Sequence, residues 1–160
     1  MHKKGLSIRR MRGAVAVEFA FLAIPLTLLL LGIAEFGNAF YQYNTIDKSV
    51  RDAARMLSAY SPLQADYPLD SARCVVAYGN PDCTGSPLLG ALTKNMVVIC
   101  DQVNTTGCTG QFKNVQTDPS GDTINIVQVT VTGYAYSQIT GFFNLAGLVF
   151  GDISCVMRQI

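Results

Sequence analysis

The side chains of this sequence that could carry out chemistry are few, and their positions argue against catalysis. The one histidine, His2, precedes the long apolar segment, so the rest of the chain has no Ser–His or Cys–His pair to activate a nucleophile. There is no glycine-rich phosphate-binding loop, and the cysteines lack the spacing of a zinc site. The sequence therefore predicts a protein that is not an enzyme and that binds neither a metal ion nor another cofactor.

One acidic side chain lies where its charge is costly. Glu18 is the only charged residue between Gly13 and Ala34, in a segment that is otherwise almost entirely apolar. As a helix, residues 14–34 rise about 31 Å, close to the ~30 Å of a bilayer core, so a membrane span has to include Glu18. A carboxylate there costs roughly 2.5 to 3.5 kcal/mol on insertion scales, and we therefore expect it to find a partner of opposite charge.

Basic residues are concentrated before the apolar segment. They are Lys3, Lys4, Arg9, Arg10 and Arg12. From Ala14 onward, seven basic residues stand against eleven acidic ones, which leaves no cationic patch for nucleic acid. Because positively charged flanks stay in the cytoplasm, we expect residues 1–13 inside, a single span in the lipid bilayer, and residues 59–160 outside. A content of 49% hydrophobic and 14% charged residues excludes a disordered chain.

The five cysteines all lie in the part of the chain expected outside the cytoplasm, where disulfides persist. The sequence does not define how they pair. Cys74 with Cys83, and Cys100 with Cys108, would close the shortest loops, so these two pairs are the favoured disulfides. Cys155 lies in an alternating pattern near the C-terminus, and we expect it to behave as a buried apolar side chain of a strand.

A helical periodicity follows the apolar segment. Apolar residues recur three or four positions apart at Phe36, Phe40, Tyr43, Ile46, Val50, Ala54 and Leu57. This pattern predicts one helix over residues 14–58, transmembrane in its first half, whose outer half packs this stripe against a domain. Pro25 is expected to bend the helix.

The remainder of the chain predicts a small sheet with short helical connectors. Residues 71–80 predict a short helix, and strands are expected near 95–102, 123–136 and 152–159. Valines alternate with glutamine and threonine in the middle strand, which is typical of a sheet with one covered and one wet face. The apolar, glycine-broken segment 137–151 is predicted to be a short helix or a loop that covers the sheet edge. The expected fold class is α+β, a long membrane-spanning helix packed on a small antiparallel sheet.

A resemblance to a known family rests on the segment from Arg12 to Arg55, "RGAVAVEFAFLAIPLTLLLLGIAEFGNAFYQYNTIDKSVRDAAR". It resembles the N-terminal helix of the TadE-like proteins, which are minor pilins or pseudopilins of the bacterial tight-adherence (Tad, Flp-type) pili. The stretches "VVAYGN" and "GSPLLGALT", and the closing pattern of strand, apolar connector and strand, also resemble that family. The resemblance implies a role in assembling an adhesive type IVb pilus at the bacterial inner membrane.

The resemblance also implies roles for individual residues. Gly13 would be the last residue of a leader peptide, Ala14 the mature N-terminus and Glu18 its fifth residue. A prepilin peptidase would cut between Gly13 and Ala14, and the further partners would be other pilins of the Tad system and its inner-membrane assembly platform. Pro25 would be a kink without chemistry.

Cleavage at Gly13 would supply the partner that Glu18 needs. The new ammonium group of Ala14 on a neighbouring subunit could pair with Glu18 and set the axial register of packed helices. Small side chains near this end would let the helices approach closely; they belong to Ala14, Ala16, Ala20 and Ala23.

Other interpretations remain open. Gly32-Ile33-Ala34 resembles the small-x-small site of a signal peptide, and a cut there would release a soluble domain beginning at Glu35. The domain could also be a signal-anchored or secreted binding domain unrelated to pili, with its sheet face holding a ligand. Glu18 could be a charge tolerated at the membrane edge, within reach of water.

Overall fold

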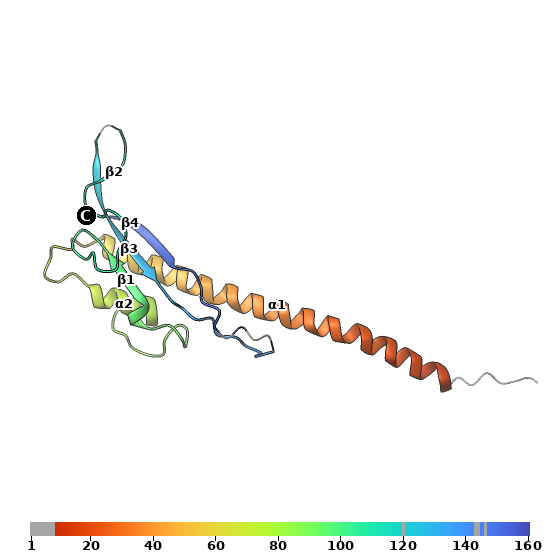
Figure 1. Cartoon of the computed structure of the whole chain (residues 1–160). Coiled ribbons are helices and arrows are strands. Elements are labelled where there is room, and N and C mark those ends of the chain that lie inside the picture. Colours follow the sequence, from red (N-terminus) through yellow and green to blue (C-terminus); the bar gives the residue numbers. More distant parts are fainter. Residues whose placement is uncertain (1–8, 120, 143–144, 146) are drawn as a thin grey trace, which may run out of the picture.

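The computed structural model describes residues 9–119, 121–142, 145 and 147–160 (Figure 1). Within them the order of elements is α1 (Arg9–Ser58), α2 (Leu69–Tyr78), the 3-10 turn η1 (Lys94–Met96), β1 (Val97–Cys100), β2 (Val115–Gln116), β3 (Thr123–Val131) and β4 (Ile153–Gln159). Figure 1 shows α1 as a long rod with a small body on its C-terminal part and its N-terminal part projecting free. The predicted α+β fold, a long helix with a small antiparallel sheet, is confirmed.

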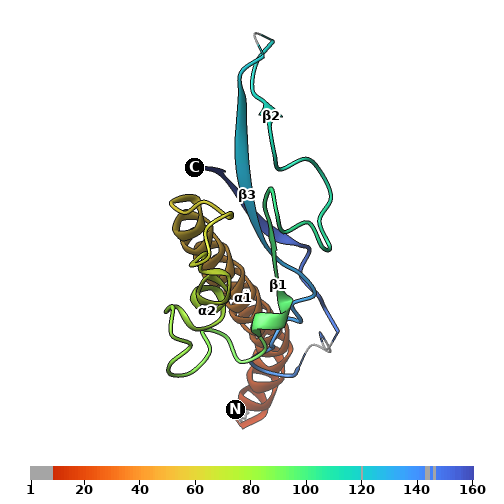
Figure 2. The same cartoon turned by 90° about the vertical axis from the view of Figure 1, so that its left-hand side faces the viewer.

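The sheet is antiparallel and is built around β3. β1 pairs with the C-terminal end of β3, with Val97 opposite Val131, and β4 pairs along the other edge. The two-residue strand β2 pairs with the N-terminal end of β3, with Val115 opposite Ile124. Figure 2 shows this end of β3 and β2 extending away from the helices.

The covered face of the sheet packs against both helices. Val127, Val129 and Val131 are at most 2% exposed, as the alternation in the sequence predicts. They join a core to which α1 contributes Ile46, Val50, Ala53, Ala54 and Leu57, and α2 contributes Ala72 and Val76. Because the core is formed by α1, α2 and the sheet together, the body is anchored on the C-terminal third of α1.

The first part of the predicted apolar stripe on α1, next to the expected span, is not covered by the body, and that part of the prediction is wrong. Phe36, Phe40 and Tyr43 are 75%, 62% and 46% exposed, whereas Glu35 and Gln42 are each 4% exposed. At 3.6 residues per turn, Phe36 and Phe40 point roughly 110° and 150° away from the face that carries Glu35 and Gln42. The body therefore covers a polar face of α1 at this level and leaves the aromatic face outside.

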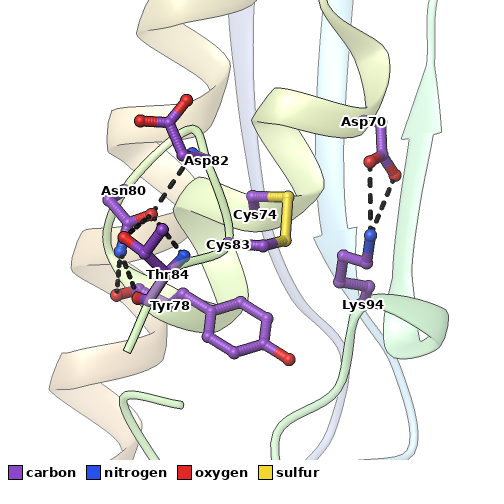
Figure 3. Close-up of a disulfide and its surroundings, with 8 residues drawn as sticks. All are labelled: Asp70, Cys74, Tyr78, Asn80, Asp82, Cys83, Thr84 and Lys94. Atoms are coloured by element: carbon purple, nitrogen blue, oxygen red, sulfur yellow. Dashed lines mark hydrogen bonds and ion pairs between the residues drawn. A yellow bond between two sulfur atoms is a disulfide. The ribbon is translucent and has the colours of Figure 1, made fainter. Parts of the chain in front are cut away.

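The loop after α2 is tied down by a disulfide and by local hydrogen bonds (Figure 3). Gly79 ends α2 in the left-handed conformation, φ 76°, and its N–H donates to the carbonyl of Val75. Cys74 and Cys83 are disulfide-bonded, and the side-chain oxygen of Asn80 accepts hydrogen bonds from the loop that they close. This segment is thereby held against the helix without a large core of its own.

The loop after β1 is organised by a second disulfide and a buried carboxylate. Cys100 and Cys108 are disulfide-bonded. Asp101 is fully buried, and its oxygens accept hydrogen bonds of 2.8 Å each from the Val103 N–H, the Asn104 N–H and the Asn104 side-chain amide. A buried charge satisfied by three donors gives the loop a single defined conformation.

The segment between β3 and β4 departs from the prediction. β3 ends at Val131 rather than near residue 136, since the chain turns at Gly133, φ 69°, and then pairs only at Ala135 with Val149. The described residues of 137–151 form a loop, which is one of the two predicted alternatives, and Thr140 in this loop contacts Glu35 of α1. Gly141 and Gly147 have φ of 63° and 98°, which no helix permits.

Candidate functional site: the membrane helix and its junction with the domain

The first half of α1 is a candidate membrane span that the rest of the chain does not cover. Its most apolar 18-residue window has a mean hydropathy of 2.4 and none of it is buried within the structure. Large side chains stand out on several faces of the helix; Phe19, Phe21 and Leu22 are 71%, 74% and 71% exposed. An apolar surface of this extent requires lipid or partner helices around it.

The predicted assembly residues lie at the beginning of this span. Gly13, Ala14 and Glu18 are all exposed on α1. Among the residues that the structure describes, none donates a hydrogen bond to Glu18 or forms an ion pair with it. The basic residues His2, Lys3 and Lys4 lie outside the described residues. Within the described residues the carboxylate of Glu18 therefore has no counter-ion, and its role stays a prediction.

Pro25 lies within α1, which continues unbroken through it. Two residues later, the Thr27 hydroxyl donates a 2.8 Å hydrogen bond to the carbonyl of Ala23. Such a bond satisfies the threonine hydroxyl inside the helix, where lipid offers it no partner. The bend assigned to Pro25 stays a prediction.

Metal ligands do not gather in the described part of the chain, where no three His, Cys, Asp or Glu side chains come together. Four of the five cysteines form the two disulfides and cannot act as metal ligands, and Cys155 is a half-buried free thiol on β4. Cys155 packs against the core, on the same face of β4 as the buried Ile153.

The structure adds a second candidate site where α1 leaves the span. Glu35 follows the expected span directly and is 4% exposed. Its carboxylate accepts hydrogen bonds from the Tyr136 hydroxyl, from the Thr140 hydroxyl at 2.6 Å, from the Thr140 N–H at 2.7 Å and from the Ile139 N–H at 3.3 Å. Four hydrogen-bond donors around one carboxylate stabilise its ionised form.

These hydrogen bonds control the ionisation of the site. The Thr140 hydroxyl, the Tyr136 hydroxyl and the Thr140 N–H hold the pKa of Glu35 down at about 2, against the opposing effect of burial. Burial raises the pKa of Tyr136, and its hydrogen bond to Glu35 raises it further. Glu35 is therefore a carboxylate at any physiological pH, and Tyr136 remains its donor.

Two more polar side chains of α1 continue this contact. Asn38 donates to the carbonyl of Ser137 at 2.8 Å and to the Tyr136 hydroxyl at 3.1 Å. Gln42 donates to the Ser137 carbonyl at 2.6 Å, and its side-chain oxygen accepts from the Tyr134 hydroxyl at 2.8 Å and from the Ser137 N–H at 3.2 Å. We call Glu35, Asn38 and Gln42 the juxtamembrane ladder.

An aromatic cluster lies beside the ladder. The Phe150 ring is 5.6 Å from Tyr134, 6.1 Å from Tyr136 and 6.1 Å from Tyr43 of α1, measured between ring centroids. Aromatic packing supplies buried area, whereas the directional hydrogen bonds of the ladder set the rotation and axial position of α1 against segment 134–140. These contacts connect α1, just beyond the expected span, to segment 134–140 of the body.

Sequence reasoning missed the ladder. Its three side chains recur at i, i+3 and i+7, which places them on one helix face. That polar spacing was a usable signal, but the aromatic residues beside it gave a stronger apolar pattern on a neighbouring face.

Comparison with known proteins bears on α1 alone. No curated protein and no solved structure matches this chain. The model of the family described as TadE-like protein matches residues 13–55, which includes the whole expected span and the ladder. This match confirms the resemblance seen in the sequence: α1, from Gly13 to Arg55, is similar to the helix of the TadE-like proteins.

Proposed function

We propose that this chain is a minor pilin or pseudopilin of a Tad-type (type IVb) pilus. It is held in the bacterial inner membrane by α1 with its N-terminus in the cytoplasm, is cut by a prepilin peptidase between Gly13 and Ala14, and polymerises through α1. The observation that carries the proposal is that the family match includes the whole apolar half of α1, the half that the chain itself leaves uncovered.

An uncovered apolar helix suits a polymerisation element. Lipid surrounds residues 14–34 before assembly, and the helices of neighbouring subunits replace that lipid in the fibre. Small residues near the start of the span, such as Ala16 and Ala20, permit close approach of the helices. Assembly through this surface requires no catalytic reaction, which agrees with a role as a structural component of a pilus.

Glu18 would set the register of that packing. It is exposed on α1 and has no partner among the described residues of its own chain. The ammonium group of Ala14 on a neighbouring subunit, formed only after cleavage, provides the opposite charge. In a low-dielectric surrounding such a pair is strongly favoured over an isolated carboxylate.

The competing cut after Ala34 fits the helix poorly. α1 continues without a break through Ala34 and Glu35, and the Glu35 side chain is engaged by the ladder. A cut there would sever α1 at the base of its contact with the body and would remove the whole apolar half of the helix.

The first test is the N-terminus of the native protein, measured by intact mass and N-terminal sequencing of material from cells. The proposal expects a chain that begins at Ala14, and it expects the uncut chain when the prepilin peptidase gene is deleted. A chain beginning at Glu35 would instead support a secreted domain. An intact Met1 in peptidase-positive cells would refute processing.

The second test concerns Glu18. Glu18→Gln is expected to leave membrane level and cleavage unchanged but to reduce incorporation into sheared pili severalfold, and Glu18→Asp is expected to retain part of it. Thr27→Gln is the matched control, since it adds the same amide to an exposed position of the span while keeping the acid. Wild-type incorporation of Glu18→Gln would contradict the pairing.

A further inference from the structure

The segment that links β3 to β4 has an unusual composition for an exposed loop. No charged residue occurs between Asp122 and Asp152. Figure 1 shows that, after leaving β3, residues 132–142 run back along α1 toward the N-terminal half of the helix. They are the part of the body that comes nearest to the expected membrane span.

The ladder fixes the level of this segment on α1. Ile139 and Thr140 donate their N–H groups to Glu35, which follows the last span residue, Ala34. Leu145 and Leu148 line a shallow hollow of ≈ 290 Å³ together with Gly32, Glu35, Phe36, Ala39 and Tyr136. Gly32 belongs to the expected span, and at 1.5 Å per residue it lies only about 3 Å inside the end of that span.

Exposed apolar side chains of the described residues gather at this level. Phe36 is 75% exposed, Ile139 65%, Leu148 47% and Val149 52%. We call these four residues the collar. A set of large apolar side chains next to a membrane span, drawn from a segment without charge, marks an interaction surface rather than a solvated loop.

We propose that the collar inserts into the outer-leaflet interface of the bilayer, so that a phospholipid surface is its partner. The body would then rest on the membrane at two places, through α1 and through Ile139, Leu148 and Val149. The argument for lipid is continuity: the collar begins where the apolar surface of the span ends and is fastened to that level by Glu35. The backbone of the loop stays among headgroups and water, which satisfy the polar groups that hydrocarbon would leave unpaired.

This inference rests on α1 spanning a bilayer, and not on the pilus role. Its consequence is a fixed depth and tilt of the body on the membrane before assembly. A second copy of the chain is the competing occupant of the collar, and it differs from lipid because its binding depends on protein concentration.

The test uses the full chain in vesicles of phosphatidylcholine and phosphatidylglycerol, with Cys155→Ser as background. A single cysteine is introduced by Ile139→Cys and labelled with an environment-sensitive fluorophore. Leu22→Cys in the span and Leu63→Cys, which replaces a 78% exposed residue beyond the far end of α1, are the two references. Quenching is measured with aqueous iodide and with lipids that carry a spin label just below the headgroup.

We expect the label at position 139 to be quenched by the spin-labelled lipid and to be severalfold less accessible to iodide than the label at position 63. If position 139 behaves like position 63 while position 22 reports lipid, the collar proposal fails and the span survives. If position 22 also reports water, the span itself is wrong. Protection that increases with the protein-to-lipid ratio would assign the collar to a second copy and would likewise overturn the proposal.

Leu148→Cys repeats the measurement at an independent position of the collar. Far-UV circular dichroism of each labelled protein verifies that the fold is retained. The expectation is the same as for position 139, and a label at 148 that iodide reaches as freely as position 63 would contradict lipid contact on this part of the loop.

Discussion

Truncating Gln42 to alanine should loosen the body from α1 without altering the span. The Gln42 side chain is 4% exposed and makes three hydrogen bonds to segment 134–137, two through its oxygen and one through its nitrogen. One of these donors, the Tyr134 hydroxyl, belongs to a residue that is 1% exposed. Gln42→Ala therefore leaves a buried hydroxyl without its acceptor.

The expected magnitude follows from those contacts. A hydrogen bond contributes about 1 kcal/mol net, and a buried polar group that loses its partner costs about 1 to 3 kcal/mol. For Gln42→Ala we expect the free energy of unfolding of the body to fall by roughly 2 to 4 kcal/mol. Asn44→Ala is the matched control, because the exposed Asn44 amide bonds only to the Phe40 carbonyl of its own helix, at 2.8 Å. Its expected cost is below about 0.5 kcal/mol.

The assay is denaturant unfolding of the full chain in detergent micelles, followed by the near-ultraviolet circular dichroism of tyrosine. A double-mutant cycle with Tyr134→Phe isolates the hydrogen bond between Tyr134 and Gln42. Because both single variants remove the same bond, the double variant should cost about 1 kcal/mol less than the sum of the two.

Two results would refute the reasoning. One is a Gln42→Ala variant that unfolds at the same denaturant concentration as Asn44→Ala. The other is additivity in the cycle to within about 0.3 kcal/mol, which would mean that Gln42 and Tyr134 act independently. Either outcome would show that packing alone, and not the ladder, sets the position of α1 on the body.

Two further predictions concern Glu35 and the first disulfide. Because the folded pKa of Glu35 is lowered from 4.5 to about 2, the unfolded chain takes up its proton first as the pH falls. The stabilisation is therefore complete above about pH 5 and is lost as the pH falls toward 2, so hydrogen-exchange protection of the Thr140 amide should decline in that window and Glu35→Gln should abolish the decline. A wild-type Thr140 amide whose protection stays constant across it would contradict this assignment. Replacing both Cys74 and Cys83 by serine removes a disulfide of sequence separation 9 and should lower the free energy of unfolding by roughly 2.5 kcal/mol, measured by denaturant unfolding. Cys155→Ser, which removes a free thiol, should lower it by less than about 1 kcal/mol. Equal losses for the two variants would refute the argument that closing the loop stabilises the body.

Local sequence patterns predicted the elements of this fold well. The 3.5-residue apolar spacing predicted one helix from the span to Ser58, and the alternation of valines predicted β3 with its covered face. Each such pattern depends on neighbours a few residues away, which the sequence displays directly. The end of β3 was placed too late because apolar residues continue past Gly133, where the backbone turns.

The chain's own residues also defined the span and its lone acid. Glu18 is singled out by composition alone, since no other charge lies between Gly13 and Ala34. Mean hydropathy and the distribution of basic residues are properties of the segment's composition. They therefore do not depend on how the body folds. The expectation of a membrane-anchored helix therefore needed no coordinates, and the expected relation to a pilus came from the resemblance to the TadE-like family.

Tertiary structure decided which face of α1 the body covers and where segment 137–150 lies. The partners of Glu35 and Gln42 are about 100 positions away in the sequence, so no local pattern shows that a polar face is the buried one. Hydrophobicity alone favours burying Phe36 and Phe40, yet the body satisfies the carboxylate and the amide instead and leaves both rings outside. Burial of a polar side chain depends on donors and acceptors that reach it with correct geometry, and only the folded chain brings those groups together.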